Sequence, residues 1–299
     1  MLTGIEEYKK VIEENFSGLK VKSIEKIGEG WDNFAFLANG GLEFRFPQDG
    51  RYYLIKQIQA EICLMPKLQD FFNLAIPNFQ YVGKHKDLPF VGYSQIVGVP
   101  LKPDLFGTLS ASAKTRAAKD LADFVSKLHS FPLDVARQCV AWEETSKEIY
   151  TKKHQRLPEL QGRIPQRLIG YLESQFRFYF QELAEFESPA VLVHQDLSPD
   201  HIIYNWDNQK IEGIIDFGDI AISDPDLDLR WMVDPDDFTP DFLDEFLQYY
   251  QHPNPGMLKK KLMFFWNVSA LVDLFHGIDN QDEKKFATGI KYLERNAKS

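Results

Sequence analysis

The sequence predicts an α+β fold with two lobes, a small antiparallel-sheet lobe followed by a larger, mostly helical lobe. Two observations support this division. Roughly the first hundred residues contain short alternating apolar runs separated by Gly-rich turns, which is typical of strands. After Pro100 the apolar residues recur at helical spacing instead. The sequence contains no internal repeat and no low-complexity linker between the two parts.

Short strand and turn signals fill the first part of the chain. It opens on a predicted helix in which Thr3 and Glu6 have the spacing of a capping box. The elements then expected are strands at 21–27, 34–38 and 42–46, a helix around 58–68, and strands at 81–82 and 93–97. Asn39-Gly40-Gly41 supplies the positive-φ residues that a tight hairpin turn needs. Alternation after that turn places Phe44 and Arg45 on opposite faces.

Helical spacing dominates the second part. Apolar residues form one stripe over 117–128, in a helix expected to end near His129, and a second stripe over 168–183. Short apolar strands are expected at 191–193, 202–204 and 211–215. Three helical stretches close the chain, roughly at 240–251, 257–276 and 281–297.

The composition is that of a globular protein. Of 299 residues, 44% are hydrophobic and 26% are charged, which excludes a wholly disordered or collagen-like chain. Lys+Arg 34 against Asp+Glu 44 gives a net charge of −10. This balance argues against a nucleic-acid partner, because phosphate binding needs clustered Lys and Arg. It is compatible with a cationic small molecule as the partner.

The sequence shows no feature of a secreted or membrane protein. Cys63 and Cys139 are too few for a disulfide framework, and no Cys/His spacing resembles a zinc site. The N-terminal residues lack the basic-then-apolar run of a signal peptide. No apolar stretch approaches the roughly 18 residues of a spanning helix. We therefore expect a cytoplasmic protein without a membrane partner.

The strongest chemical signal is a pair of loop motifs. His194-Gln195-Asp196-Leu197-Ser198-Pro199-Asp200-His201 follows one predicted strand, and Asp216-Phe217-Gly218-Asp219 follows a later one. His201 lies five residues after Asp196, and Asp216 fifteen residues after His201. We expect these side chains to meet at the ends of adjacent strands. Phosphoryl transfer uses such a set, because one carboxylate accepts the proton of the attacking hydroxyl while others hold Mg²⁺ on the nucleotide phosphates.

Taken singly, each of these residues has a structural explanation. An Asp after a strand is commonly a turn or cap residue, and a buried His is more often a hydrogen-bonded core residue than a ligand. The joint occurrence at this spacing, behind a predicted sheet with a glycine loop, favours the functional interpretation.

The two motifs resemble those of the kinase-like small-molecule phosphotransferases, and most closely those of the aminoglycoside phosphotransferase family. His201 at the end of the catalytic block is similar to the 2''-phosphotransferase branch, as are the runs 215–219 and 222–226. The resemblance implies a protein-kinase-like fold. Its parts would be a nucleotide-binding lobe at 1–97 with a hinge near 94–98, and a C-terminal lobe at 98–299, with a catalytic core at about 100–135 and 190–256 and helical substrate-binding parts at about 136–189 and 257–299.

The resemblance also implies roles for the loop residues. Asp196 is the expected catalytic base, and His201 and Asp216 are the expected Mg²⁺ ligands. Imidazole is a softer ligand than Mg²⁺ usually prefers. His201 therefore either binds one of two ions weakly or acts through water.

Six further residues are expected to hold ATP or GTP: Gly28, Gly30, Arg45, Glu61, Ser94 and Ile96. The two glycines lie between predicted strands, where a glycine loop could cover phosphates, although Gly-x-Gly also marks any tight turn. Arg45 stands where the family usually has a phosphate-binding Lys, and it keeps the charge. Glu61 is placed to pair with Arg45, with a plain surface carboxylate as the alternative.

Negative charge marks the expected acceptor side. Residues 190–250 contain fifteen Asp and Glu but only two Lys and Arg. Asp219, Asp234 and Asp237 are expected to neutralise ammonium groups of one ligand, with a solvated acidic face as the alternative for 234–237.

Other residues near the acceptor side have a more structural interpretation. Asp224, Asp226 and Asp228 are expected to stabilise a loop and a helix start. Trp266 resembles a family aromatic that stacks on a sugar ring, with a core position as the alternative.

We therefore expect a monomeric aminoglycoside O-phosphotransferase of the antibiotic-resistance type. It would move the γ-phosphate of ATP or GTP onto a hydroxyl, first of all the 2''-hydroxyl, of a polycationic aminoglycoside. One alternative is a kinase of another small alcohol, such as choline, a thiosugar, homoserine or a macrolide. Another is a nucleotide-binding pseudokinase, suggested by Arg45 in place of Lys.

Overall fold

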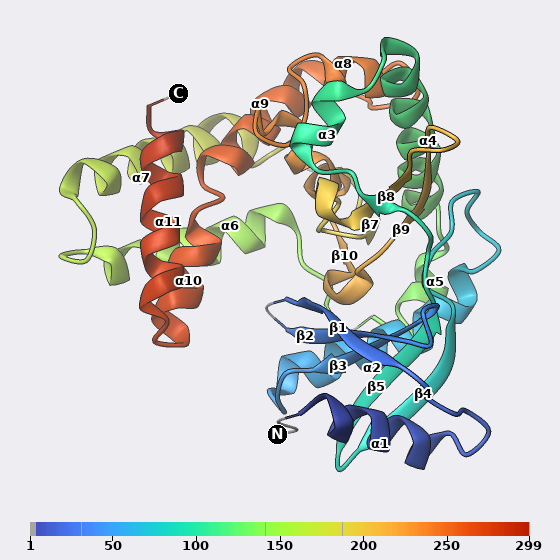
Figure 1. Cartoon of the computed structure of the whole chain (residues 1–299). Helices are drawn as coiled ribbons and strands as arrows, with labels where there is room; N and C mark the ends of the chain where they lie inside the picture. Colours follow the sequence, from blue (N-terminus) through green and yellow to red (C-terminus); the bar gives the residue numbers. More distant parts are fainter. Residues whose placement is uncertain (1–3, 31, 141, 187, 299) are drawn as a thin grey trace.

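The computed structural model describes residues 4–30, 32–140, 142–186 and 188–298. The chain forms a small lobe built on a five-stranded antiparallel sheet and a larger, mostly helical lobe (Figure 1). The predicted α+β, two-lobed fold class is thus confirmed. Within the described residues, no helix is long and apolar enough to cross a membrane.

The small lobe is a sheet with strand order β1-β2-β3-β5-β4. Its strands are β1 Ile24–Glu29, β2 Asn33–Ala38, β3 Leu42–Pro47, β4 Phe79–His85 and β5 Leu88–Ser94. The predicted hairpin turn is present, with Asn39 at φ 54° and Gly40 at φ 66°. The strand predicted at 93–97 runs instead over β5 and ends at Ser94, where the chain leaves the sheet.

The alternation of β3 fixes the two faces of this sheet. Phe44 and Phe46 pack with Tyr8 and Ile12 of helix α1 (Ile5–Asn15) in one apolar cluster. Arg45 therefore lies on the opposite face, as predicted. Gly4 occupies the N-cap position of α1, and the expected capping residue Thr3 lies outside the described residues.

Helix α2 (Tyr52–Leu68) connects the two lobes and starts six residues before the predicted helix. Its last turns carry Leu64 and Leu68, which are buried in the core cluster of the large lobe. The segment after α2 continues this junction, because Ala75 exchanges backbone hydrogen bonds with β9. Gly213 permits that approach, since a Cβ there would lie 2.4 Å from the Ala75 carbonyl oxygen.

The large lobe consists of helices around two small sheets, with orders β6-β8-β9 and β10-β7. Its strands are β6 Val99–Pro100, β7 Val191–Val193, β8 Ile202–Asn205, β9 Lys210–Ile214 and β10 Ala221–Ser223. Its α-helices are α3 Pro103–Thr108, α4 Ala111–His129, α5 Leu133–Ala136, α6 Ser146–Gln155, α7 Gln166–Phe178, α8 Phe242–Phe246, α9 Pro255–Asn267, α10 Leu271–Asp279 and α11 Glu283–Asn296.

Two of the predicted C-terminal helices differ from the structure. The stretch 257–276 is interrupted between α9 and α10, and the stretch 240–251 forms only the short α8. Residues 268, 270 and 271 at the interruption are all buried. Apolar periodicity therefore continues through the break and conceals it.

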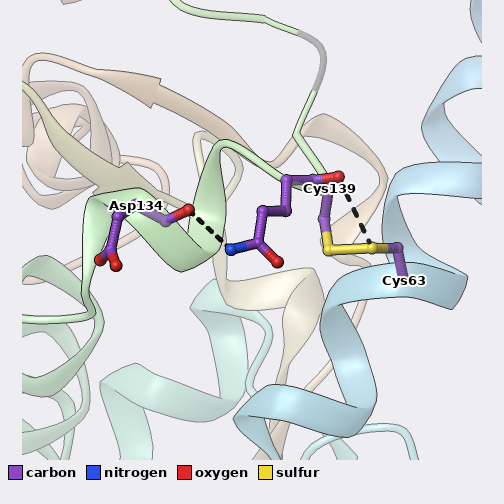
Figure 2. The surroundings of a disulfide bond; sticks show 4 residues. Cys63, Asp134 and Cys139 are labelled. Carbon is purple, nitrogen blue, oxygen red and sulfur yellow. Dashed lines mark hydrogen bonds between the residues drawn. A yellow bond between two sulfur atoms is a disulfide. The ribbon is translucent and has the colours of Figure 1, made fainter.

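A disulfide joins Cys63 of α2 to Cys139, which follows α5 in the large lobe (Figure 2). Their Cα atoms are 5.4 Å apart, although the cysteines are separated by 76 positions in sequence. Two cysteines do not make a disulfide framework, and no local sequence pattern indicates this single bond between distant residues. It adds a covalent link between the helix that carries Glu61 and the large lobe.

Candidate functional site

The first loop motif is held in place by a buried carboxylate. Strand β7 delivers the chain to His194, and Asp228 then accepts hydrogen bonds from the backbone N–H groups of His194 (3.1 Å) and Gln195 (2.6 Å). Asp228 also pairs with His129 Nε2 at 3.0 Å. Gln195 has a φ of 68°, a left-handed conformation that these bonds help to maintain. Asp196 therefore follows a rigidly fixed residue.

His201 lies between the two loop carboxylates. Its Nδ1–H donates to the carbonyl oxygen of Asp196 (2.8 Å), and Nδ1 is 3.4 Å from the Asp196 carboxylate. Its Nε2 is 3.5 Å from Asp216 Oδ2. Burial lowers the pKa of His201, but the charges of Asp216 and Asp196 outweigh it and the net shift is upward. The three predicted residues thus converge.

Asp216 follows β9 in a left-handed conformation, with φ 63°. This turn brings its Oδ1 within 3.4 Å of Arg45 Nη2 from the small lobe. Desolvation acts to raise the pKa of Asp216, but Arg45 and His201 outweigh it and the pKa is lowered. The carboxylate is therefore kept ionised where the two lobes meet.

Arg45 and Glu61 form the predicted pair. Both are buried, and the guanidinium meets the carboxylate through two hydrogen bonds of 2.9 and 3.2 Å. Burial raises the pKa of Glu61 while Arg45 lowers it, and the net shift is upward. Through this pair, α2 fixes the cation that faces Asp216.

Side chains from two neighbouring segments hold the glycine loop between β1 and β2 by hydrogen bonds. Gln48 donates its side-chain amide to the Gly30 carbonyl (2.6 Å) and its backbone N–H to that of Asp32 (2.8 Å). Tyr53 of α2 donates to the Asp32 carboxylate at 2.9 Å. Gly28 pairs with Ala35 where the register between β1 and β2 shifts. Trp31, which follows Gly30, lies outside the described residues.

The expected hinge residues Ser94 and Ile96 line a cavity of about 400 Å³. The lining outside the hinge segment comes from the segment after α2 and from the β8–β9 hairpin, including Ala75, Asn205 and Glu212. Neither Gly28 nor Arg45 belongs to this lining. Ser94 and Ile96 thus lie at this cavity, whose lining does not include the Arg45–Asp216 contact.

Asp219 lies beside the two loop carboxylates. Burial and the charges of Asp196 and Asp216 raise its pKa to about 7. Gln57 of α2 donates its side-chain amide to Asp219 Oδ1 at 2.8 Å, a contact between residues 162 positions apart. Gln57 could not be predicted from local patterns, because no nearby residues link the helix to the loop.

A second acidic group contains Asp234, Asp236 and Asp237. Burial and the charges of Asp234 and Asp200 raise the pKa of Asp237 to about 7. Asp200 belongs to the first loop motif. Asp234 is buried and pairs with Arg295 of α11 at 3.2 Å. Sequence reasoning found the carboxylates but missed this cation, which lies about sixty positions away.

Trp266 joins the second acidic group through the same arginine. Its side chain is 5% exposed, and the Arg295 guanidinium lies over the ring at 5.5 Å from the centroid. Its indole N–H is buried without a hydrogen-bond partner among the described residues. Trp266 therefore has a core position with one face against a cation.

Asp224 and Asp226 have the structural role expected from the sequence. Both are buried and ion-paired with Lys261 of α9. Asp226 also pairs with His252 at 3.1 Å, and Asp224 caps the turn that begins at Pro225. With Asp228, they anchor the segment that packs against the first loop motif.

Across residues 4–30, 32–140, 142–186 and 188–298, no three Asp, Glu, His or Cys side chains gather tightly enough to hold a metal ion by themselves. The arrangement can still hold an ion that brings its own oxygen ligands, because Mg²⁺ is commonly bound through one or two carboxylates plus substrate phosphates and water.

Comparison with known proteins supports a phosphate-transfer site. Residues 23–260 match the family described as "Phosphotransferase enzyme family". The GDP and kanamycin complex of APH(2'')-IIIa is 30% identical, with a TM-score of 0.90 over 97% of this chain and 98% of that chain. The GDP complex of wild-type aminoglycoside 2'-phosphotransferase-IIIa is also 30% identical, with a TM-score of 0.90 over 98% of each chain.

A more distant similarity extends to another acceptor class. The macrolide 2'-phosphotransferase MphH from Brachybacterium faecium has a TM-score of 0.75 over 96% of this chain and 98% of that chain. At 16% identity this likeness shows the fold alone. The resemblance seen in the two loop motifs is confirmed by these matches.

Proposed function

This chain belongs to the phosphotransferase enzyme family, and we propose that it transfers the γ-phosphate of ATP or GTP to a hydroxyl, first of all the 2''-hydroxyl, of a polycationic aminoglycoside. The observation that carries the proposal is the junction at Asp216. There, one carboxylate lies 3.4 Å from Arg45 of the small lobe and 3.5 Å from His201 of the catalytic loop. Phosphoryl transfer depends on positioning and charge of this kind.

Asp196 is proposed as the base that orients and deprotonates the acceptor hydroxyl. Its backbone carbonyl and carboxylate both contact His201 Nδ1, at 2.8 and 3.4 Å, and Asp228 fixes the preceding residue. Its carboxylate is 29% exposed, so an acceptor hydroxyl can reach it. A general base of this type typically contributes a factor of about 10²–10⁴ to the rate.

The donor set around Asp216 fits Mg²⁺. Because His201 Nδ1–H is committed to a carbonyl, the lone pair of a neutral ring at Nε2 faces the Asp216 carboxylate. These two groups repel unless a proton or a cation lies between them. His201 and Asp216 would hold the ion, directly or through water, and the bound ion would neutralise charge on the nucleotide phosphates.

The small lobe, which we place at 1–97, would hold the nucleotide. Arg45 is proposed to contact its phosphates under the Gly28–Gly30 loop, while Glu61 keeps the guanidinium in place. The hinge segment that includes Ser94 and Ile96 would contact the base. The choice between ATP and GTP is left to the assay described below.

The acceptor would lie between Asp219 and the second acidic group of the large lobe. Asp219 is next to the catalytic carboxylates, and Asp234 and Asp237 form part of the second group. Burial and neighbouring carboxylates raise the pKa of Asp219 and of Asp237 to about 7, and a polycationic ligand would stabilise their ionised forms. Trp266 would pack under the ligand at the second group.

The direct test is mass spectrometry of kanamycin and gentamicin after incubation with ATP or GTP and Mg²⁺. We expect each to gain one phosphate, and NMR of the product to place it on the 2''-hydroxyl. Transfer only to a macrolide or to choline would contradict the aminoglycoside assignment. Nucleotide binding without any product would favour a pseudokinase.

Metal dependence has a separate readout. The rise in Tm caused by GTP should be larger with Mg²⁺ than with EDTA, because the ion links the phosphates to His201 and Asp216. Equal shifts in both conditions would remove Mg²⁺ from the nucleotide site.

A further inference from the structure

The last turn of α11 carries a cation into the second acidic group. Arg295 donates to Asp234 Oδ2 through Nη2 at 3.2 Å and to Asp236 through Nη1. Its guanidinium also lies over the rings of Trp266 and Tyr292, at 5.5 and 5.3 Å from their centroids. Paired carboxylates and an aromatic face are the contacts by which a protein recognises an organic cation.

The position of this arginine is fixed by its neighbour. Asn296 is buried and donates its side-chain amide to the Trp266 carbonyl oxygen at 2.8 Å. Arg295 Nε–H in turn donates to Asn296 Oδ1 at 3.1 Å. The end of α11 is thus anchored on α9, while the Arg295 side chain itself remains 32% exposed. An incoming ligand can therefore compete with the guanidinium without unfolding the helix.

The acidic group retains more negative charge than Arg295 neutralises. Asp234 and Asp236 share the guanidinium, and Asp237 adds a third carboxylate near Asp200 of the catalytic loop. The excess negative charge attracts a polycation to the carboxylates that already bind the Arg295 guanidinium. The guanidinium of Arg295 is itself an organic cation, and it already occupies these carboxylates and the face of Trp266.

We propose that Arg295 occupies an ammonium subsite of the acceptor cleft and must be displaced by the acceptor. The inference rests on the proposed function, because the acceptor is taken to be a polycation. Arg295 forms ion pairs with two carboxylates at once. A ligand with a single ammonium group can replace only one of these two ion pairs. A ligand with several ammonium groups replaces both contacts. The internal cation thereby lowers the affinity for any cationic acceptor that must displace it, and several ammonium groups on one ligand best offset the lost contacts.

The experiment is calorimetric titration of kanamycin, and separately of spermine, into the full chain and its Arg295→Gln variant. The expected result is about threefold tighter binding of both probes to the variant, the size of effect that partly exposed ion pairs give. The gain should shrink as salt rises. In steady state the variant should lower the KM for kanamycin, with kcat and the nucleotide KM unchanged.

A matched control removes a different arginine from the same helix junction. Arg167 of α7 pairs with Glu294, the residue before Arg295, and both partners are partly exposed. Arg167→Gln should leave both affinities unchanged, which separates loss of the internal cation from a general loosening of α11. If Arg295→Gln does not fold, Arg295→Lys replaces it, since Lys lacks the two-pronged donor geometry and should give a smaller gain in the same direction.

Equal or weaker binding of both probes to Arg295→Gln, at an unchanged Tm, would overturn the inference and make Arg295 a structural ion pair. The failure of the proposed function looks different. In that case no aminoglycoside is phosphorylated by the wild type, while spermine still reports whether Arg295 competes with a cation.

Discussion

Arg45 connects the small-lobe sheet both to Glu61 of α2 and to Asp216 of the large lobe. It is buried together with Glu61, and no water can take over its role as partner of that carboxylate. Because Arg45 also faces Asp216, it serves both the stability of the lobe and the charge of the site. The guanidinium meets both Glu61 oxygens through two separate nitrogens, a forked geometry that the single ammonium nitrogen of Lys lacks.

Replacing Arg45 by Met should therefore destabilise the protein. Glu61 would be left buried without its cation, which costs about 3–5 kcal/mol in the free energy of unfolding. Urea unfolding followed by circular dichroism measures the loss. Arg137→Met is the control, because its pair with Glu143 is exposed and should contribute nothing measurable. Equal midpoints for both variants would contradict the importance of the buried pair.

Asp237 should make stability depend on pH. Burial and neighbouring carboxylates raise its folded pKa to about 7, while the unfolded value is about 3.9. Between these values the folded state binds the extra proton, so stability falls as pH rises from about 4 to 7. Asp237→Asn should raise Tm at pH 7 and leave it unchanged at pH 4.

A thermal-shift series across pH tests this, with Asp241→Asn as the control from an exposed position in the same segment. A Tm gain of equal size at pH 4 and pH 7 would exclude titration of Asp237 as the cause.

Helix α2 is the element that organises the site. It carries Glu61 for Arg45, Gln57 for Asp219 and Cys63 for the disulfide to the large lobe. Its last turns are buried in the large-lobe core. One helix thus fixes the small-lobe cation relative to the loops that carry the carboxylates.

Opening the disulfide should weaken this junction. A crosslink between residues 76 positions apart restricts the unfolded chain, which corresponds to about 4 kcal/mol of stability in the chain-entropy estimate. Dithiothreitol should lower the urea midpoint of the oxidised protein. The Cys63→Ser/Cys139→Ser double variant should start at the lower midpoint and not respond to the reductant. A response of the double variant would assign the effect to something other than this bond.

The elements show which features sequence patterns could predict. The hairpin at Asn39-Gly40 and the two faces of β3 follow from local turn chemistry and alternation, and both are present. The interruption between α9 and α10 was missed because buried apolar residues continue through it. The helix predicted at 240–251 is longer than the observed α8 because periodicity alone does not reveal where a helix stops.

The whole molecule brings together residues that the sequence keeps far apart. The convergence of Asp196, His201 and Asp216 was predictable, because Asp196 and Asp216 each follow a short strand and His201 directly precedes one, at a spacing that the resemblance made specific. Gln57, Arg295 and the Cys63–Cys139 bond were not, since each acts across a long separation without a local signal. The roles assigned to these residues stay predictions until they are measured.

The two lobes divide the proposed reaction between them, with nucleotide contacts in the small lobe and the base in the large lobe. Changing Asp196 to Asn should therefore separate binding from turnover. The most direct measurement is kcat for kanamycin phosphorylation, alongside the Kd for GTP, in Asp196→Asn and in the exposed control Asp207→Asn. We predict a fall in kcat of about 10²–10⁴ for Asp196→Asn with the Kd unchanged, and no change for the control. Turnover by Asp196→Asn at the wild-type rate would contradict the account.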